Sequence, residues 1–184
     1  MNNRPNVPGL QDLLSQLESR QRNDPHDTLV QLAVRLRAGD TCEYCLLRTS
    51  GVFHVDHIIP PDFWQDYVVG NLPELPPIDG RRGPDHLDNF AWCCPYCNGN
   101  KSQRVTAKVN GRNHRLFDPR HDVWPEHFVF MHHYLLVIGI TPVGQATQQA
   151  LNVNHGGLTG PLGTRHDAIL RDHYPPPWAR AWIL

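Results

Sequence analysis

The sequence lacks the features that would place the protein in a membrane. Its longest apolar run, Tyr134 to Ile140, is far too short to span a bilayer. The N-terminus lacks the basic segment followed by an apolar segment that is typical of a secretory signal. We therefore expect a cytoplasmic protein without a membrane partner.

The sequence also lacks a strong net charge and internal repeats. The 17 Lys and Arg residues nearly balance the 18 Asp and Glu residues, which gives a net charge of −1. This balance argues against tight, sequence-independent wrapping of nucleic acid, although it leaves room for a local basic face. With 184 residues, 40% hydrophobic and 19% charged, the chain is expected to form one compact domain with extensions.

Four of the five cysteines form two Cys-x-x-Cys pairs, Cys42 with Cys45 and Cys94 with Cys97. In a reducing cytoplasm such pairs are better explained as metal ligands than as disulfides, and this spacing predicts a tetrahedral structural zinc site. Disulfides or buried free thiols are the alternative. A redox role fits less well, because reactive pairs do not flank an Asp-His sequence. The remaining Cys93 is expected to be a buried strand residue.

A second set of polar residues lies between and after the cysteine pairs. Asp56-His57 opens the stretch Asp-His-Ile-Ile-Pro, and Asn98 follows the last cysteine. The Asp56 carboxylate and the Asn98 amide oxygen suit one Mg²⁺ or Mn²⁺ ion that also binds water and phosphate oxygens. An unperturbed imidazole titrates close to neutral pH, so His57 suits the role of general base. A two-metal site would need more carboxylates, and only Asp56 and Asp88 are near.

The sequence around these residues predicts a strand, a long loop, a second strand and a helix. In chain order these are a strand at 51–58, a loop at 61–84 with a short helix at its aromatic start, a strand at 90–93 and a helix from Pro95. His54 would share a strand face with Asp56. It is interpreted either as a structural hydrogen-bonding residue or as a contact to metal or phosphate.

Helices and a hairpin are predicted on either side of this segment. Leucines at helical spacing predict two helices within residues 8–37, with a break at Asn23-Asp24-Pro25. Residues 127–140 predict a hairpin, and Thr141-Pro142 begins a helix over 143–151. The expected organisation is an N-terminal helical extension at 1–39, a core at 40–125 with the long loop 61–84, and a C-terminal extension at 126–184 that packs on the core.

The segment that follows Asn98 is basic. From Asn98 to His121 there are six Lys and Arg residues and one acid, a local charge of +5. Such a run is either a solvated face or a surface that contacts phosphate. Because it adjoins the candidate metal ligands, Lys101, Arg104 and Lys108 are expected to contact a DNA backbone.

Taken together, these motifs resemble the HNH endonuclease family. The resemblance is carried by Asp56-His57-Ile-Ile-Pro, Leu87-Asp88-Asn89 and Cys94-x-x-Cys97-Asn98-x-x-Lys101. It is closest to the zinc-containing branch, in which two Cys-x-x-Cys pairs flank the motif. Asn89 and Asn98 are nine residues apart, as in the HNH domain of the RNA-guided CRISPR effector nuclease. Segments 116–120, 124–128 and 139–144 resemble the sequence C-terminal to this core in small stand-alone bacterial HNH proteins.

The resemblance implies an α+β fold with a small ββα-metal core, a four-cysteine zinc site, N-terminal helices and a C-terminal hairpin-plus-helix extension. It implies that Asp56 and Asn98 bind the catalytic metal, that His57 activates water, and that Asn89 hydrogen-bonds the loop carrying His57. The loop at 61–84 is longer than the Gly-rich link of such proteins, and Asn98 replaces the last His of the signature.

The implied function is hydrolysis of DNA by a bacterial or phage-encoded endonuclease. A homodimer would be the simple way to cut both strands, and a larger nuclease, defence or phage assembly is the other expected setting. The alternative function is a non-catalytic, zinc-stabilised nucleic-acid-binding module. That alternative leaves Asp56, His57, Asn89 and Asn98 unexplained.

Overall fold

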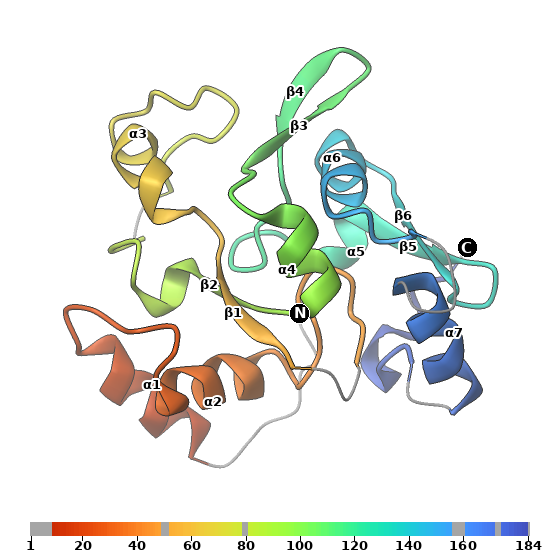
Figure 1. Ribbon diagram of the computed structural model, residues 1–184, viewed down its shortest axis with the longest axis horizontal. Coiled ribbons are helices and arrows are strands. Elements are labelled where there is room, and N and C mark those ends of the chain that lie inside the picture. Colours follow the sequence, from red (N-terminus) through yellow and green to blue (C-terminus); the bar gives the residue numbers. More distant parts are fainter. Residues whose placement is uncertain (1–8, 49–51, 79–80, 156–160, 172–173, 184) are drawn as a thin grey trace.

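The computed structural model describes residues 9–48, 52–78, 81–155, 161–171 and 174–183 (Figure 1). These residues form a mixed α+β structure whose strands pair into two-stranded antiparallel sheets. The helices are α1 Leu10–Glu18, α2 Thr28–Arg37, α3 Trp64–Val68, α4 Pro95–Lys101, α5 Trp124–His127, α6 Pro142–Leu151 and α7 Pro161–Leu170. The strands are β1 His54–His57, β2 Phe90–Cys93, β3 Thr106–Val109, β4 Arg112–Arg115, β5 Phe128–Met131 and β6 Leu136–Gly139. In this part of the chain, every helix is too short or too polar to cross a bilayer.

Strands β1 and β2 and helix α4 form the centre of the structure (Figure 1). The antiparallel pairing runs from His54 opposite Cys93 to His57 opposite Phe90. Helix α4 begins at Pro95, as predicted, and the Cys94 thiol accepts a hydrogen bond from the Cys97 amide. The second strand has its predicted bounds. The first strand is shorter than predicted at both ends, from His54 to His57, because β2 offers only four partner residues; Gly51 lies outside the described residues.

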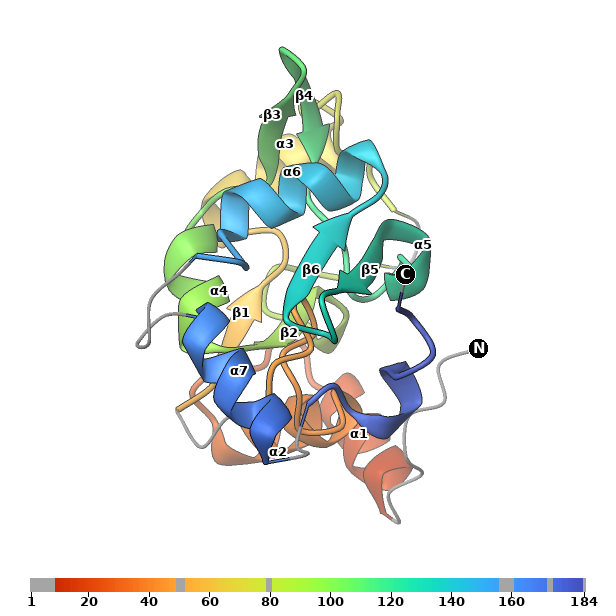
Figure 2. The same ribbon diagram turned by 90° about the vertical axis from the view of Figure 1, so that its right-hand side faces the viewer.

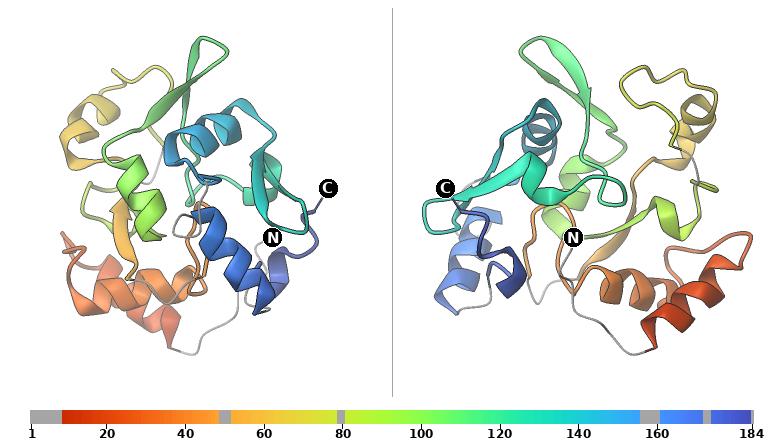
Figure 3. Two further views of the ribbon diagram at one scale, coloured as in Figure 1. Left: turned by 45° about the vertical axis from the view of Figure 1, so that its right-hand side comes forward. Right: turned by 180° about the vertical axis from the view of Figure 1, so that it is seen from behind.

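The two N-terminal helices cover one side of β2, and the break between them is where the sequence predicts it. Asp27 caps α2 and accepts a hydrogen bond from the Leu29 amide at 2.7 Å. Leu17 of α1 and Val30 of α2 are fully buried against Phe90 and other residues of β2. These helices lie at the opposite end of the molecule from the β3–β4 hairpin in both views of Figure 3.

The C-terminal part contains the predicted hairpin β5–β6 and the predicted helix α6, whose cap Thr141 accepts a hydrogen bond from the Gly144 amide. Helix α6 lies between the β3–β4 hairpin and the β5–β6 hairpin (Figure 2). Helix α7 and the β3–β4 hairpin were not predicted. Arg165 holds α7 in place: it is fully buried and donates hydrogen bonds to the carbonyl oxygens of Leu135 and Val153.

Gly144 lets α6 pack closely against the segment that precedes β5. A Cβ atom at this position would overlap the backbone carbonyl oxygen of His127. We expect Gly144→Ala to lower the free energy of unfolding by about 2 kcal/mol or more, because backbone atoms must move to make room. Urea denaturation would measure this loss. Gly99→Ala in α4 is the matched control, since a Cβ there meets no atom within 4 Å, and its stability should be unchanged or higher.

Candidate metal centre and catalytic site

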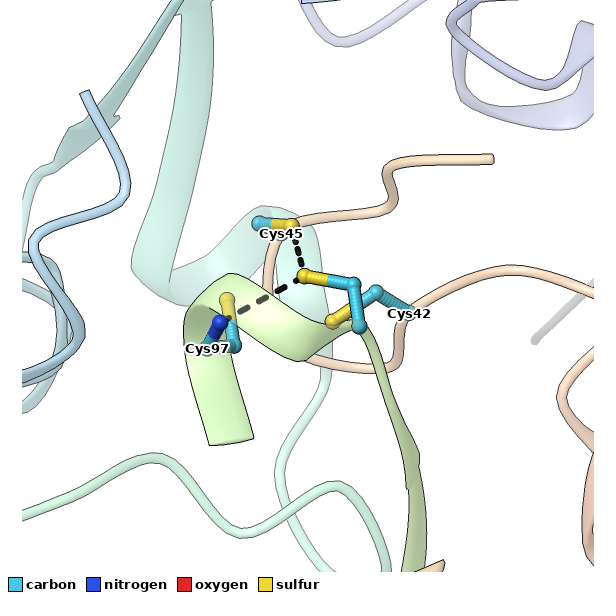
Figure 4. A group of neighbouring side chains, drawn as sticks. Cys42, Cys45 and Cys97 are labelled. Atoms are coloured by element: carbon cyan, nitrogen blue, oxygen red, sulfur yellow. Dashed lines mark hydrogen bonds between the residues drawn. The ribbon is translucent and has the colours of Figure 1, made fainter. Parts of the chain in front are cut away.

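Four cysteine thiols come together where the loop after α2 meets the start of α4 (Figure 4). The sulfur atoms of Cys42, Cys45, Cys94 and Cys97 all lie within 4.8 Å of one another. The Cys45 and Cys94 sulfurs are 3.8 Å apart, and four thiolates placed tetrahedrally at about 2.3 Å from zinc would be separated by about 3.8 Å. All four are buried and none forms a disulfide. The cluster can therefore hold a metal ion such as zinc.

Hydrogen bonds from distant segments fix the first cysteine pair. The Glu43 amide donates to the Trp92 carbonyl oxygen, and the Glu43 carboxylate accepts from the Trp92 amide, each at 2.9 Å. The Trp124 indole donates to the Tyr44 carbonyl oxygen at 2.9 Å, and the Tyr174 hydroxyl donates to the Cys45 carbonyl oxygen at 3.1 Å. The C-terminal extension therefore supports the cysteine cluster directly.

The thiol pKa values of Cys42, Cys94 and Cys97 shift in different directions. Burial acts to raise the pKa of Cys42, but contacts with the neighbouring thiols outweigh it and lower that pKa well below the usual value. Contacts with Cys42 and Cys45 raise the pKa of Cys94 and of Cys97. Four thiolates together therefore need a cation to neutralise them. Cys93 lies outside this group as a buried residue of β2, as predicted, and burial raises its pKa.

Asp56 is buried in β1 and faces helix α4. Its carboxylate accepts a hydrogen bond from the Tyr44 hydroxyl at 2.8 Å. The Lys101 ammonium lies 3.1 Å from the same carboxylate and also donates to the His57 carbonyl oxygen at 2.7 Å. Burial raises the pKa of Asp56, while Lys101 and then Tyr44 act in the opposite direction. A buried carboxylate is thus held by one positive charge and one hydroxyl.

This placement corrects the expectation that Lys101 contacts DNA. The Lys101 side chain is 2% exposed, so an ammonium bound to Asp56 cannot also reach a phosphate on the surface. Replacing Lys101 with Met would leave Asp56 buried without its counter-charge. We expect Lys101→Met to lower the free energy of unfolding by about 3 kcal/mol, measured by urea denaturation. Arg104→Met is the control, because Arg104 is exposed and its guanidinium donates to carbonyl oxygens rather than to a buried acid.

Asn98 lies on the same face of α4 as Lys101, because the two residues are three apart in the helix. Its half-buried side chain has no hydrogen-bond partner among the described residues. A carboxylate and a free amide oxygen on neighbouring elements are the donor types that Mg²⁺ accepts. Asp56 and Asn98 therefore offer the types of oxygen atom that a divalent cation binds. Binding would require an Asp56 carboxylate oxygen to leave Lys101 and contact the ion.

His57 has different surroundings from Asp56, because adjacent strand residues point to opposite faces. Its Nε2 atom lies 3.0 Å from the Asp85 carboxylate, and its ring packs edge-on against Phe90 with centroids 5.0 Å apart. The ring remains 20% exposed. The structure thus brings Asp56 together with the helix that carries Asn98, and it turns the His57 ring toward Asp85. Asp85 was not predicted as a site residue, because it lies outside the Leu87-Asp88-Asn89 motif.

Asn89 holds the chain that follows His57. Its side-chain oxygen accepts from the Ile59 amide at 2.9 Å, and its side-chain nitrogen donates to the Ile59 carbonyl oxygen at 2.8 Å. The expected hydrogen bonds to the loop that carries His57 are therefore present. Arg81, from the long loop, also donates to Asn89 at 2.8 Å and pairs with Asp118. Arg81 thereby attaches the end of the long loop to the residue that holds the chain after His57.

Two other candidate residues have no role in this geometry. Asp88 accepts hydrogen bonds from Arg82 and lies 3.1 Å from His86, so it is engaged away from Asp56. His54 is exposed on β1, and its side chain makes no hydrogen bond within the part of the chain that the structure describes. Neither supports a second metal ion.

Comparisons of the whole chain with protein-family models, curated proteins and solved structures gave no significant match.

Proposed function

We propose that this protein is a metal-dependent endonuclease of the HNH type that hydrolyses DNA phosphodiester bonds, with structural zinc in the four-cysteine cluster. The observation that carries the proposal is the setting of His57. Its ring is partly exposed, is held by the Asp85 carboxylate, and sits on a chain segment fixed by Asn89. A module that only binds zinc and DNA would need none of these contacts. The antiparallel pair β1–β2 followed by α4 is also the arrangement that a ββα-metal core requires.

In this mechanism His57 accepts a proton from a water molecule as its oxygen attacks phosphorus. The bond between phosphorus and the leaving oxygen then breaks, and the negative charge on that oxygen must be stabilised. A bound Mg²⁺ or Mn²⁺ would supply positive charge for this purpose. Asp56 and Asn98 are the residues that would hold the ion, and Lys101 keeps Asp56 neutralised when the ion is absent. Asn89 keeps the His57 segment in register with β2.

The proposed DNA contact is the β3–β4 hairpin, which projects from the body of the molecule (Figures 1 and 3). The basic run of residues 98–121 is not one uniform face, because Lys101, Arg115 and Arg120 are paired with acids. The cations of this run without an acidic partner, within the described residues, are Arg104, Lys108 and Arg112. A two-stranded ribbon of this kind fits the major groove of DNA.

The base of the hairpin borders a groove of about 470 Å³. Its walls are Phe63, Leu72 and Glu74 from the long loop and residues 102–106 from the chain that enters β3. The Glu74 carboxylate would repel phosphate, whereas Arg104 and Lys108 would attract it. We therefore expect the DNA backbone to follow the hairpin side of the groove.

Salt titrations would test this surface. Lys108→Ala and Arg112→Ala should each reduce the slope of log affinity against log salt by about one, because each phosphate contact releases about 0.9 of a counterion. The loss of affinity should be the same for all DNA sequences, since contacts to the DNA backbone do not distinguish bases. Arg171→Ala, an exposed arginine after α7, is the control. If neither hairpin substitution changes the slope, the DNA follows another path, with exposed Arg82 of the long loop as the next candidate.

Incubation of supercoiled plasmid with the purified, zinc-containing protein tests the proposed function. Mg²⁺ should be added or omitted, rather than removed with a chelator that would also strip zinc. We expect nicked or linear DNA only when Mg²⁺ is present. Binding of the plasmid without any cleavage in Mg²⁺ or Mn²⁺ would favour the non-catalytic DNA-binding module instead.

A further inference from the structure

Asp85 connects His57 to the N-terminal helices. One carboxylate oxygen lies 3.0 Å from His57 Nε2, and the other lies 2.6 Å from Arg22 Nε. The Asp85 carbonyl oxygen accepts a hydrogen bond from the Asn23 amide at 2.8 Å. Arg22 and Asn23 lie between α1 and α2. Both the main chain and the side chain of Asp85 are therefore fixed by a segment more than sixty residues away in the sequence.

The backbone contact is the stronger of the two attachments. The Arg22 side chain is 82% exposed, so its ion pair with Asp85 contributes little. Asn23 is 1% exposed and its side chain donates to the Leu17 carbonyl oxygen at 3.2 Å, which fixes the corner between the helices. On the other side, Arg37 of α2 donates to the carbonyl oxygens of Leu87 and Phe90. The segment from Asp85 to Phe90 is thus held from both ends by the helical extension.

A carboxylate next to one ring nitrogen determines which nitrogen of a neutral histidine carries the proton. An ionised Asp85 carboxylate can only accept a hydrogen bond. It therefore selects the neutral form of His57 that carries the proton on Nε2, and Nδ1 keeps a lone pair. His57 Nδ1 has no partner among the described residues.

We propose that Asp85 is a positioning residue for His57, and that the corner between α1 and α2 holds Asp85 in place. Its catalytic consequence rests on the proposed endonuclease function. Asp85 makes Nδ1 the nitrogen that receives the proton from the attacking water, and the N–H on Nε2 stays bound to the carboxylate. The N-terminal helices then belong to the catalytic apparatus rather than serving only as a cover for β2.

The first test reads the ring of His57 without any cleavage. In ¹⁵N-labelled protein at about pH 8, where an ordinary histidine is neutral, a protonated and a bare ring nitrogen give well-separated signals. The His57 signals are assigned by their absence in His57→Ala. We expect protonated Nε2 and bare Nδ1 in the wild type, and a mixture of both forms in Asp85→Ala. Asp88→Ala, in the same segment, should leave the wild-type pattern. The same pattern in Asp85→Ala as in the wild type would overturn the proposal.

The second test measures cleavage of pre-bound DNA. Asp85→Asn should slow it by roughly 10²–10⁴-fold while the Kd for DNA stays the same, because Asp85 acts through His57. Equal rates in Asp85→Asn and the wild type would overturn the positioning role. If the wild type itself does not cleave DNA, the proposed function fails, and the ring-nitrogen signals still decide whether Asp85 holds His57.

Discussion

Cys42→Ser should abolish both metal binding and cooperative unfolding of the protein. A structural zinc ion contributes roughly 10–16 kcal/mol of apparent folding free energy in small sites, and the net stability of a domain is only about 5–15 kcal/mol. All four sulfur atoms are buried within 4.8 Å of one another, so the loss of one thiolate leaves a ligand set that cannot enclose the ion. Cys97→Ser should have the same effect. Zinc content by mass spectrometry and a thermal melt would measure both losses.

Cys93→Ser is the matched control for this prediction. Cys93 directly precedes Cys94 and is equally buried, yet it lies outside the four-sulfur group. The Cys93 variant should therefore keep one zinc ion per chain and a cooperative melt, with some loss of stability from a buried hydroxyl. The absence of zinc from wild-type protein purified without chelator would contradict the assignment. Equal zinc loss in the Cys93 and Cys42 variants would contradict the choice of ligands.

His57→Ala should slow DNA cleavage by roughly 10²–10⁴-fold, which is the usual contribution of a general base. The substitution should leave the fold and the zinc ion intact, because the ring is partly exposed and, among the described residues, its hydrogen bond is to Asp85 and its aromatic contact is with Phe90. Single-turnover cleavage of bound duplex DNA measures the chemical step without the binding step.

His54→Ala is the control for the base assignment, since His54 lies in the same strand and is exposed. It should cleave at the wild-type rate. A loss in His54→Ala as large as that in His57→Ala would move the base elsewhere. Equal rates in the wild type and His57→Ala would indicate that a contaminating nuclease causes the cleavage.

Local signals in the sequence were sufficient to predict the elements around the site. Pro95 starts α4, Thr141-Pro142 starts α6, and the strand at 90–93 has the predicted bounds, because each depends on neighbouring residues alone. The four-cysteine cluster was predictable because Cys-x-x-Cys spacing already places two thiols on one side of a turn.

Contacts between distant residues could not be predicted in the same way. The sequence groups Lys101 with the surface cations, but its ammonium pairs with the Asp56 carboxylate, which is 45 residues away in the chain. Asp85 has no local signature, because its role depends on His57 and on the corner between α1 and α2. The β3–β4 hairpin was detectable from its Asn110-Gly111 turn, whose residues both have positive φ. Its strands have no clear pattern in the sequence, because β3 alternates polar and apolar residues over only four positions and β4 is polar throughout.

Cleavage in water labelled with heavy oxygen would establish whether this protein uses water to hydrolyse DNA, which is the core of the proposed function. Supercoiled plasmid is incubated with zinc-containing wild-type protein and Mg²⁺, and the new terminal phosphates are analysed by mass spectrometry. We predict one solvent oxygen in each new terminal phosphate, formed at a rate that falls with His57→Ala. Intact plasmid, or cut ends without solvent oxygen, would contradict hydrolysis by this protein.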